Sequence, residues 1–142
     1  MSTDIALAET REDIAATWPV MRQLRPHLDA QAYLELVVQL QAERHFKLAR
    51  MAVDGHVVAA AGLRFGEWLH GGRYLEIEDF VTSEESRSLG HGGAFFGWIA
   101  ALARDSGCRH LRLLSGVQRE AAHRFYRRKG MRQEACYFSL EL

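Results

Sequence analysis

The sequence predicts a mixed α/β domain in which helices pack on a central sheet. Apolar residues make up 48% and charged residues 25% of the 142 residues, proportions typical of one globular domain with a single core. The hydrophobic spacing alternates along the chain between the helical and the strand period. The predicted order is strand, two helices, three strands, helix, strand, helix and strand, so we expect a single layered domain over residues 1–142.

The first third of the chain is predicted to form a short strand and two helices. Ile5–Leu7 is the candidate strand, and Thr10 followed by Asp13 has the spacing of a capping box that opens a helix through about Leu24. Asp29 can cap the second helix, because its side chain can accept a hydrogen bond from an amide of the first turn. Apolar residues then recur at helical spacing, at Tyr33, Leu36, Val37 and Leu40.

Three strands are predicted in the middle of the chain. The segments FKLARMAV and HVVAAAGLRF flank Asp54-Gly55, a dipeptide typical of a two-residue hairpin turn. The segment RYLEIEDFVT alternates charged and apolar residues, which indicates a further strand. The pattern of the chain therefore changes from helices to strands after about Leu40.

The second half of the chain returns to helices. The stretch RSLGHGGAFFGWIAAL, residues 87–102, leads into a helix predicted from about Gly92 to Arg104, which Gly107 ends. HLRLLSG follows as a strand. QREAAHRFYRRKG is predicted as a short helix that Gly130 stops, and ACYFSLEL is predicted as the closing strand.

Charge, hydropathy and cysteine content exclude several classes of function. Lysine plus arginine equals aspartate plus glutamate at 18 each, so the net charge gives no support for sequence-independent nucleic-acid binding, and a local basic patch stays open. No apolar run reaches the roughly 20 residues of a membrane span, and the polar N-terminus is no secretory signal. Two cysteines without such a signal indicate a cytoplasmic chain with reduced thiols. The seven histidines lack the HExxH spacing, so we expect no metal site.

The glycine-rich stretch Arg87–Gly93 joins a predicted strand to a predicted helix. In that setting successive backbone N–H groups can turn toward one anion, and the helix dipole favours negative charge. Gly90, Gly92 and Gly93 remove Cβ atoms that would hold a phosphate away, and Arg87 can add a charge-assisted contact. The alternative is a plain loop. The two common nucleotide loops are excluded, because Gly-Lys-Ser/Thr and the third glycine of G-x-G-x-x-G are missing.

Two motifs in order resemble the signatures of the GNAT superfamily of N-acetyltransferases. The first, Q/R-x-x-G-x-G/A, is met within RSLGHG. The second, N-x-x-A-x-x-x-Y before a closing Gly-Phe, is met in part within REAAHRFYRRKGM, about thirty residues later. Arg119 stands where asparagine is usual, and Met131 replaces the phenylalanine. IEDFVT matches the family's central strand and the element order also matches, so the resemblance covers nearly the whole chain.

The resemblance implies a central mixed, mostly antiparallel sheet flanked by helices, and acetyl-CoA as the acetyl donor. A homodimer is a further expectation from the family. In the family, backbone groups of the central strand pair with the pantetheine arm and loop amides hold the pyrophosphate. These roles carry over to Phe80, Val81 and Thr82 of the strand and to Arg87, Ser88, Leu89, Gly90, His91, Gly92 and Gly93 of the loop, while the Arg119 departure puts one contact to the cofactor arm in question.

Acetyl transfer to an amine needs a base, a donor to the oxyanion and an acid for the departing thiolate. The resemblance makes Tyr126 the acid, since a phenol with a pKa of about 10 can protonate a thiolate. The alternative is that Tyr126 only packs the last helix. His123, one turn earlier, either orients substrate or is a hydrogen-bonded, partly buried histidine.

Three carboxylates crowd the strand IEDFVT and its start. A period-two count puts Glu76 and Glu78 on one face and Asp79 on the other with Ile77 and Val81. The resemblance favours Glu78 as a water-mediated base or an amine-binding carboxylate, with Asp79 as the second choice. A solvated strand face is the alternative for all three.

The sequence therefore predicts an N-acetyltransferase that moves an acetyl group from acetyl-CoA to a primary amine of a small molecule by direct attack in a ternary complex. Two alternatives stay open. One is a protein acetyltransferase that acts on a lysine or an N-terminal amine. The other is an acyl-CoA-binding regulatory module that has lost catalysis.

Overall fold

The computed structural model of the chain describes residues 1–43 and 45–142. They form two compact units, Met1–Arg112 and Leu113–Leu142, and each is described by itself. Within these residues, no helix has both the length and the apolar character that crossing a bilayer requires. The elements are β1 (Thr3–Leu7), α1 (Arg11–Met21), α2 (Ala30–Ala42), β2 (Phe46–Val53), β3 (His56–Trp68), β4 (Gly72–Thr82), the 3-10 turn η1 (Glu84–Ser86), α3 (His91–Asp105), β5 (His110–Leu113) and α4 (Glu120–Arg128).

Both predicted caps of the N-terminal helices are confirmed. The Thr10 hydroxyl accepts a hydrogen bond from the amide of Asp13 at 3.0 Å, at the start of α1. The Asp29 carboxylate accepts one from the amide of Ala32 at 2.7 Å, at the start of α2. Each cap satisfies an amide that the first turn leaves without a helical carbonyl, so local sequence fixes where both helices begin.

The sheet has the order β1-β2-β3-β4-β5, and its pairs from β1 to β4 are antiparallel. The turn between β2 and β3 is Asp54-Gly55, with φ of 50° and 82°, the left-handed conformation that the predicted hairpin needs. β5 begins beside the start of β4, where the Arg109 amide donates to the Arg73 carbonyl at 2.8 Å. With four residues against eleven, β5 is too short to cover the whole outer edge of β4.

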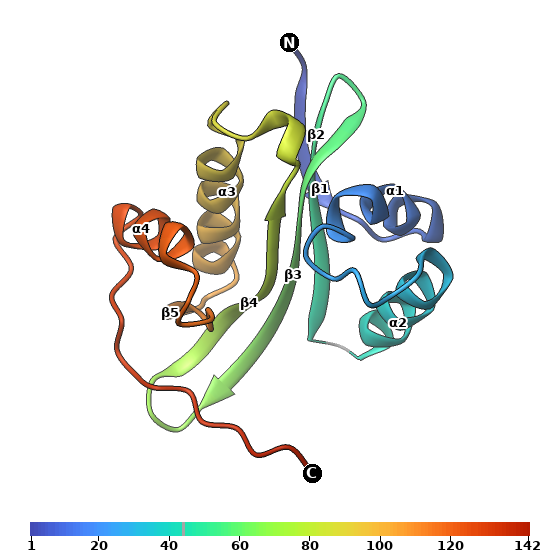
Figure 1. Cartoon of the computed structure of the whole chain (residues 1–142). Helices are drawn as coiled ribbons and strands as arrows, with labels where there is room; N and C mark the ends of the chain where they lie inside the picture. The colour runs from blue at the N-terminus through green and yellow to red at the C-terminus, as the bar shows by residue number, and fades with distance from the viewer. Residues whose placement is uncertain (44) are drawn as a thin grey trace. The chain divides into compact units, whose positions relative to one another are not determined.

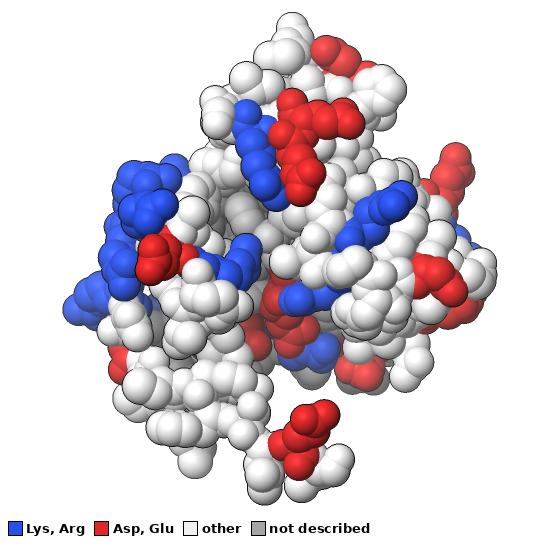
Figure 2. All heavy atoms as spheres, viewed as in Figure 1, with Lys and Arg blue, Asp and Glu red and all other residues white. Residues whose placement is uncertain are grey.

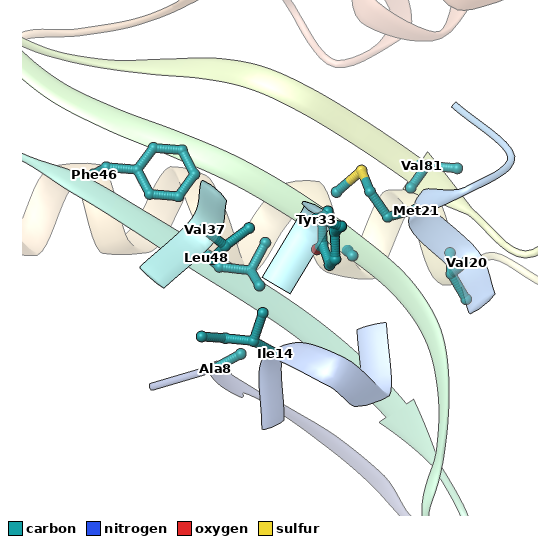
Figure 3. Close-up of a cluster of buried hydrophobic side chains, with 10 residues drawn as sticks. Ala8, Ile14, Val20, Met21, Tyr33, Val37, Phe46, Leu48 and Val81 are labelled. Atoms are coloured by element: carbon teal, nitrogen blue, oxygen red, sulfur yellow. The ribbon is translucent and has the colours of Figure 1, made fainter. Parts of the chain in front are cut away.

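Helices cover both faces of the sheet in unit 1, with α1 and α2 on one face and α3 on the other (Figure 1). On the α3 face, Phe80 of β4 stacks on the buried Phe95 of α3, with ring centroids 5.6 Å apart. On the α1–α2 face, buried side chains from the helices and strands point toward one another (Figure 3). This cluster consists of Ala8, Ile14, Val20, Met21, Tyr33, Val37, Phe46, Leu48, Ala60 and Val81.

A β-bulge interrupts the pairing of β3 with β4. Leu63 lies opposite Ile77, but the next residue back along β3, Gly62, lies opposite Asp79. Glu78 is therefore the extra residue on β4. An inserted residue shifts the alternation of side chains by one position, so Ile77 and Asp79 face opposite sides of the sheet.

The bulge changes which side chains of β4 share a face. Val81 belongs to the core cluster under α1 and α2, and Asp79, two residues earlier, faces the same side. Glu76 lies opposite Arg64, which is two residues along β3 from Gly62, so Glu76 faces that side as well. The prediction that Glu76 and Asp79 lie on opposite faces is therefore wrong, because a period-two count does not anticipate the inserted residue.

Unit 2 consists of α4 and the segments that flank it. Gly130 follows α4 with a φ of 91°, the left-handed conformation of a residue that ends a helix, as predicted. The predicted closing strand ACYFSLEL is wrong, because residues 131–142 hold no helix or strand. A strand needs a neighbour to pair its backbone groups, and the apolar side chains of this segment are not packed. Those exposed are Tyr137, Phe138, Leu140 and Leu142.

Candidate functional site

The loop after β4 turns sharply before α3. Arg87 is extended, whereas Ser88 and Gly90 have φ of 72° and 82°, both in the left-handed region. For a serine this conformation costs on the order of 1–3 kcal/mol, and such strain is typical of loops that hold a ligand. A Cβ at Gly90 would meet nothing within 4 Å, so its backbone conformation, rather than crowding, explains the glycine there.

The start of α3 presents backbone donors. Gly90 is the N-cap and provides no capping side chain. The first amide bonded within the helix is that of Ala94, which donates to the Gly90 carbonyl at 3.2 Å. The amides of His91, Gly92 and Gly93 therefore precede the first helical hydrogen bond, which makes them donors for an anion. The His91 side chain is buried, with 8% of its surface exposed, so this residue offers its backbone to the loop.

Each carboxylate of β4 is paired with an arginine from a different segment. Nε of Arg112, from β5, donates to Glu76 at 2.7 Å. Nε of Arg64, from β3, donates to Glu78 at 2.9 Å. The hydrogen bond to Glu78 raises the pKa of Arg64, so this arginine stays charged.

The third pair joins β4 to the segment after α1. Nε of Arg25 donates to Oδ1 of Asp79 at 2.7 Å, and Nη2 of the same arginine donates to the Glu78 carbonyl at 3.3 Å. The other carboxylate oxygen of Asp79, Oδ2, points at Gly62, where a Cβ would lie only 2.4 Å from it. The missing side chain of Gly62 thus makes room for the Asp79 carboxylate.

The arginine partners are functional candidates that the sequence reasoning missed. Arg64 and Arg112 are single cations within the apolar segments GLRF and HLRL, which is the signal that could have found them. Arg112 also lies over two aromatic rings, 4.4 Å from the Trp68 centroid and 3.6 Å from that of Tyr74. Cation–π contacts of this kind fix the guanidinium beside Glu76.

A cavity of about 360 Å³ lies on the α1–α2 face of the sheet. Its polar lining groups include Arg25, His27 and Asp79, and Gly62 lies at its wall. Glu78 is not among the lining residues. The apolar side chains that line it are Met21, Leu28, Tyr33, Leu36, Val37, Leu40, Phe46 and Leu48.

Unit 2 contains the predicted acid. The Tyr126 side chain is buried, and burial raises the pKa of its phenol while Arg119 lowers it, with burial the larger effect. The phenol therefore keeps its proton at neutral pH. Nε2 of His123 lies 3.1 Å from the Ser115 hydroxyl, which makes it a hydrogen-bonded and partly buried histidine.

Basic side chains gather over α4, as Figure 2 shows. Glu120 at the start of the helix is its acidic residue, and its last turn holds Arg127 and Arg128. In the described part of the chain, no group of three or more histidine, cysteine, aspartate or glutamate side chains could hold a metal ion.

The loop residues suit the pyrophosphate of a coenzyme. Three consecutive amides precede the first helical hydrogen bond, the N-cap brings no competing side chain, and Arg87 is exposed beside them. On the strand before the loop, Asp79, which is paired with Arg25, lines an apolar cavity. An anion cradle that follows such a strand is typical of an enzyme that binds an anionic cosubstrate.

The chain belongs to the acetyltransferase (GNAT) family, whose sequence model matches residues 7–131. It is 32% identical over 117 residues to the uncharacterized N-acetyltransferase YhdJ of Bacillus subtilis (strain 168), a match that covers 82% of each chain. It is 28% identical over 137 residues to the aminoalkylphosphonate N-acetyltransferase of Salmonella typhimurium, covering 94% of this chain and 88% of that one.

Solved structures share the fold at low identity. The aminoglycoside N-acetyltransferase AAC(6')-Iy in complex with a bisubstrate analog has a TM-score of 0.86 at 14% identity, with 100% of this chain and 99% of that one covered. The ribosomal-protein-alanine N-acetyltransferase of Brucella melitensis biovar Abortus has a TM-score of 0.84 at 17% identity, with 99% of each chain covered. Likeness at this identity shows the fold and leaves the acceptor open.

The family assignment confirms three predictions from the sequence. The chain is an acetyl-CoA-dependent acetyltransferase, its acetyl donor is acetyl-CoA, and its fold is the mixed, mostly antiparallel sheet flanked by helices. The predicted site residues fall in both units. Glu78, Asp79, the strand Phe80–Thr82 and the loop Arg87–Gly93 lie in unit 1, whereas Arg119 and Tyr126 lie in unit 2.

Proposed function

We propose that the protein transfers the acetyl group of acetyl-CoA to a primary amine of a small molecule by direct attack in a ternary complex. One observation carries this proposal. Asp79 lines a cavity of small-molecule size, and β4 ends three residues later at Thr82, just before the loop whose amides are donors for an anion. One strand thus connects a candidate acceptor cavity to a candidate coenzyme loop.

The backbone does most of the coenzyme binding in this proposal. Backbone groups of Phe80, Val81 and Thr82 pair with the pantetheine arm, and the amides from Ser88 to Gly93 hold the pyrophosphate, with Arg87 adding a charge. Arg119, the N-cap of α4, adds a further contact to the coenzyme arm. When bound, acetyl-CoA supplies the acetyl group as a reactive thioester.

Glu78 and Asp79 have separate proposed roles toward the amine, one as base and one as binding group. An amine is protonated at neutral pH and must lose a proton before it can attack. We assign the base role to Glu78, acting through water, because the bulge sets its side chain apart from the regular alternation of β4. Asp79 binds the ammonium group of the acceptor, since it lines the cavity and Glu78 does not.

Tyr126 is the proposed acid for the departing thiolate. Its buried phenol has a raised pKa and therefore carries a proton to donate over the whole neutral range. His123 is assigned no step, because its ring is held by Ser115.

The test is release of free thiol from acetyl-CoA by the full chain over a panel of amines, with Tyr126→Phe as the diagnostic variant. Loss of a general acid should lower kcat about a hundredfold. Tyr137→Phe is the matched control, because Tyr137 is exposed and should leave kcat unchanged. A Tyr126→Phe enzyme with unchanged kcat on its best amine would remove the acid assignment.

The same panel separates the alternatives. Acetylation of lysine or N-terminal peptides in preference to every small amine would favour a protein acetyltransferase. No turnover of any amine, together with micromolar binding of acetyl-CoA, would favour the regulatory module.

Three broader predictions belong to this proposal. Units 1 and 2 act as one domain, which is supported by a family match that runs across their boundary at Arg112. A cytoplasmic location is supported by Cys108 and Cys136, which are both free thiols. A homodimer rests on the family alone, and sedimentation of the purified chain tests it.

A further inference from the structure

We propose that the cavity on the α1–α2 face selects a primary monoamine carried on an apolar body, such as an arylalkyl or alkyl chain. This inference rests on the proposed function, because it names the class of acceptor that the same site takes. It separates this chain from the relatives and structures whose named acceptors are an aminoalkylphosphonate and an aminoglycoside.

The walls of the cavity are mostly hydrocarbon. Eight of its twelve lining residues are apolar or aromatic, and they come from α1, α2, β2 and the segment between the helices. Figure 3 shows five of them, Met21, Tyr33, Val37, Phe46 and Leu48, in the cluster where Tyr33, Val37 and Leu48 lie at the centre. Apolar walls bind apolar surface by removing it from water.

The aromatic wall is fixed in place. The hydroxyl of Tyr33 lies 2.7 Å from that of Thr17, and Thr17 in turn donates to the Ile14 carbonyl at 2.6 Å. Trp18 packs on the Tyr33 ring at a centroid distance of 5.1 Å. The Tyr33 hydroxyl is thus held by Thr17, and the buried Tyr33 ring forms a rigid part of the cavity wall.

The charges of the cavity suit one ammonium group. Arg25 donates to Oδ1 of Asp79, and within the described part of the chain Oδ2, beside Gly62, accepts no hydrogen bond. An ammonium donates hydrogen bonds and would find its acceptor there. A single amine on an apolar body can donate a hydrogen bond to Oδ2 of Asp79 and place its apolar part against the walls of the cavity.

More polar acceptors are disfavoured by the same groups. A phosphonate would compete with β4 for Arg25, because Nε and Nη2 of this arginine already donate to Asp79 and to the Glu78 carbonyl. An aminoglycoside carries several ammonium and hydroxyl groups, which would lose water against Leu28, Leu36 and Leu40 without gaining partners.

The experiment compares 2-phenylethylamine with 2-aminoethylphosphonate as acceptors for the full chain, in the wild type and in Leu36→Gln. Leu36 lines the cavity yet is 40% exposed, so a polar residue there should leave the fold intact. Leu69→Gln is the matched control, because Leu69 is fully exposed in the β3–β4 turn. The KM for acetyl-CoA reports any damage to the coenzyme loop.

We expect kcat/KM for 2-phenylethylamine to exceed that for 2-aminoethylphosphonate at least tenfold. Leu36→Gln should lower kcat/KM for 2-phenylethylamine roughly tenfold, as expected for lost contact in an apolar pocket. Leu69→Gln should leave this value unchanged, and neither variant should change the KM for acetyl-CoA. A preference for 2-aminoethylphosphonate, or a Leu36→Gln loss that is equal for both amines, overturns the inference while the proposed function stands.

Direct binding makes the test independent of turnover. Measured by calorimetry, the affinity for 2-phenylethylamine should be about tenfold weaker in Leu36→Gln than in the wild type. Asp79→Asn should weaken it by a similar factor but leave its uncharged counterpart, 2-phenylethanol, unchanged. If no amine is acetylated, the proposed function fails, and binding that responds to Leu36→Gln in this way still supports the apolar cavity. If 2-phenylethylamine does not bind, or binds equally in Leu36→Gln, the inference is wrong.

Discussion

The loop before α3 and the strand β4 are neighbours in the chain but present opposite kinds of chemistry. The loop offers backbone amides, with left-handed conformations at Ser88 and Gly90 and no side-chain cap. β4 offers side chains, and each of its three carboxylates is held by an arginine. Binding by the loop depends on the conformation of its backbone, whereas the chemistry of β4 depends on the functional groups of its side chains. The two regions should therefore respond to different substitutions.

The largest expected effect concerns a side chain of β4. Glu78→Gln keeps the shape but removes the proposed base, so kcat at neutral pH should fall about a hundredfold. Activity should recover at higher pH, where solvent deprotonates the amine. A pH–rate profile checks this, with Glu76→Gln as the control because it alters the same strand and also loses an arginine partner. An unchanged profile in Glu78→Gln would remove its base role.

The next effect concerns Tyr33, a buried residue in the wall of the cavity on the α1–α2 face. Burial raises the pKa of Tyr33 from 10.0 to about 12. A raised pKa in the folded state means that the neutral phenol stabilises the fold below pH 10 and that this stability is lost as the pH rises toward 12. The loss is on the order of 2 kcal/mol in the free energy of unfolding.

Urea unfolding at pH 8 and pH 11 measures part of this loss, because pH 11 lies between the unfolded and the folded pKa. Tyr33→Phe should be less stable at pH 8, since it loses the contact with Thr17, but its stability should change less between the two pH values. Tyr137→Phe, at an exposed tyrosine, should keep the wild-type difference. Equal pH dependence in all three proteins would argue against a buried phenol at Tyr33.

A substitution that strains the backbone of the loop should have a smaller effect, which is confined to coenzyme binding. Gly90→Ala forces a side chain into a left-handed residue at a cost of roughly 1–2 kcal/mol, so the KM for acetyl-CoA should rise about tenfold. Gly97→Ala is the control in the same helix. No contact lies within 4 Å of its added Cβ, and alanine is the better helix former, so binding should not change and the helix should be stabilised. A similar KM in both variants would contradict the role of the left-handed turn.

The smallest expected effect is the sharpest test of a loop that acts through its backbone. Ser88→Gly removes the side chain and relieves the strained φ of 72°. If only the amide of residue 88 matters, the KM for acetyl-CoA should stay within about twofold of the wild type. A tenfold rise would show that the Ser88 hydroxyl takes part in binding.

Local signals in the sequence predicted much of the architecture. The caps at Thr10 and Asp29, the Asp54-Gly55 turn and the stop at Gly130 are each set by a few adjacent residues, and all four are confirmed. The glycine loop was predicted at the right place for the same reason. These features depend on short-range backbone preferences that a single sequence displays.

The features that were missed depend on contacts between distant segments. The bulge at Glu78 depends on register with β3, and Asp79 pairs with Arg25, 54 residues away. Strand propensity in ACYFSLEL also did not suffice, because a strand requires a pairing partner that propensity cannot supply. The cavity is likewise a product of helix packing, although its wall residues Tyr33, Leu36, Val37 and Leu40 were visible as a helical stripe.

The three arginine partners of β4 have a consequence for how acceptor preference can evolve. Arg25, Arg64 and Arg112 come from three separate segments, so a single substitution releases one carboxylate and leaves the other two pairs intact. Selection can thus expose one new negative charge at a time without altering the strand that carries all three. Of the three carboxylates, Asp79 lines the cavity, so loss of Arg25 is the single substitution that would add negative charge at the proposed acceptor site.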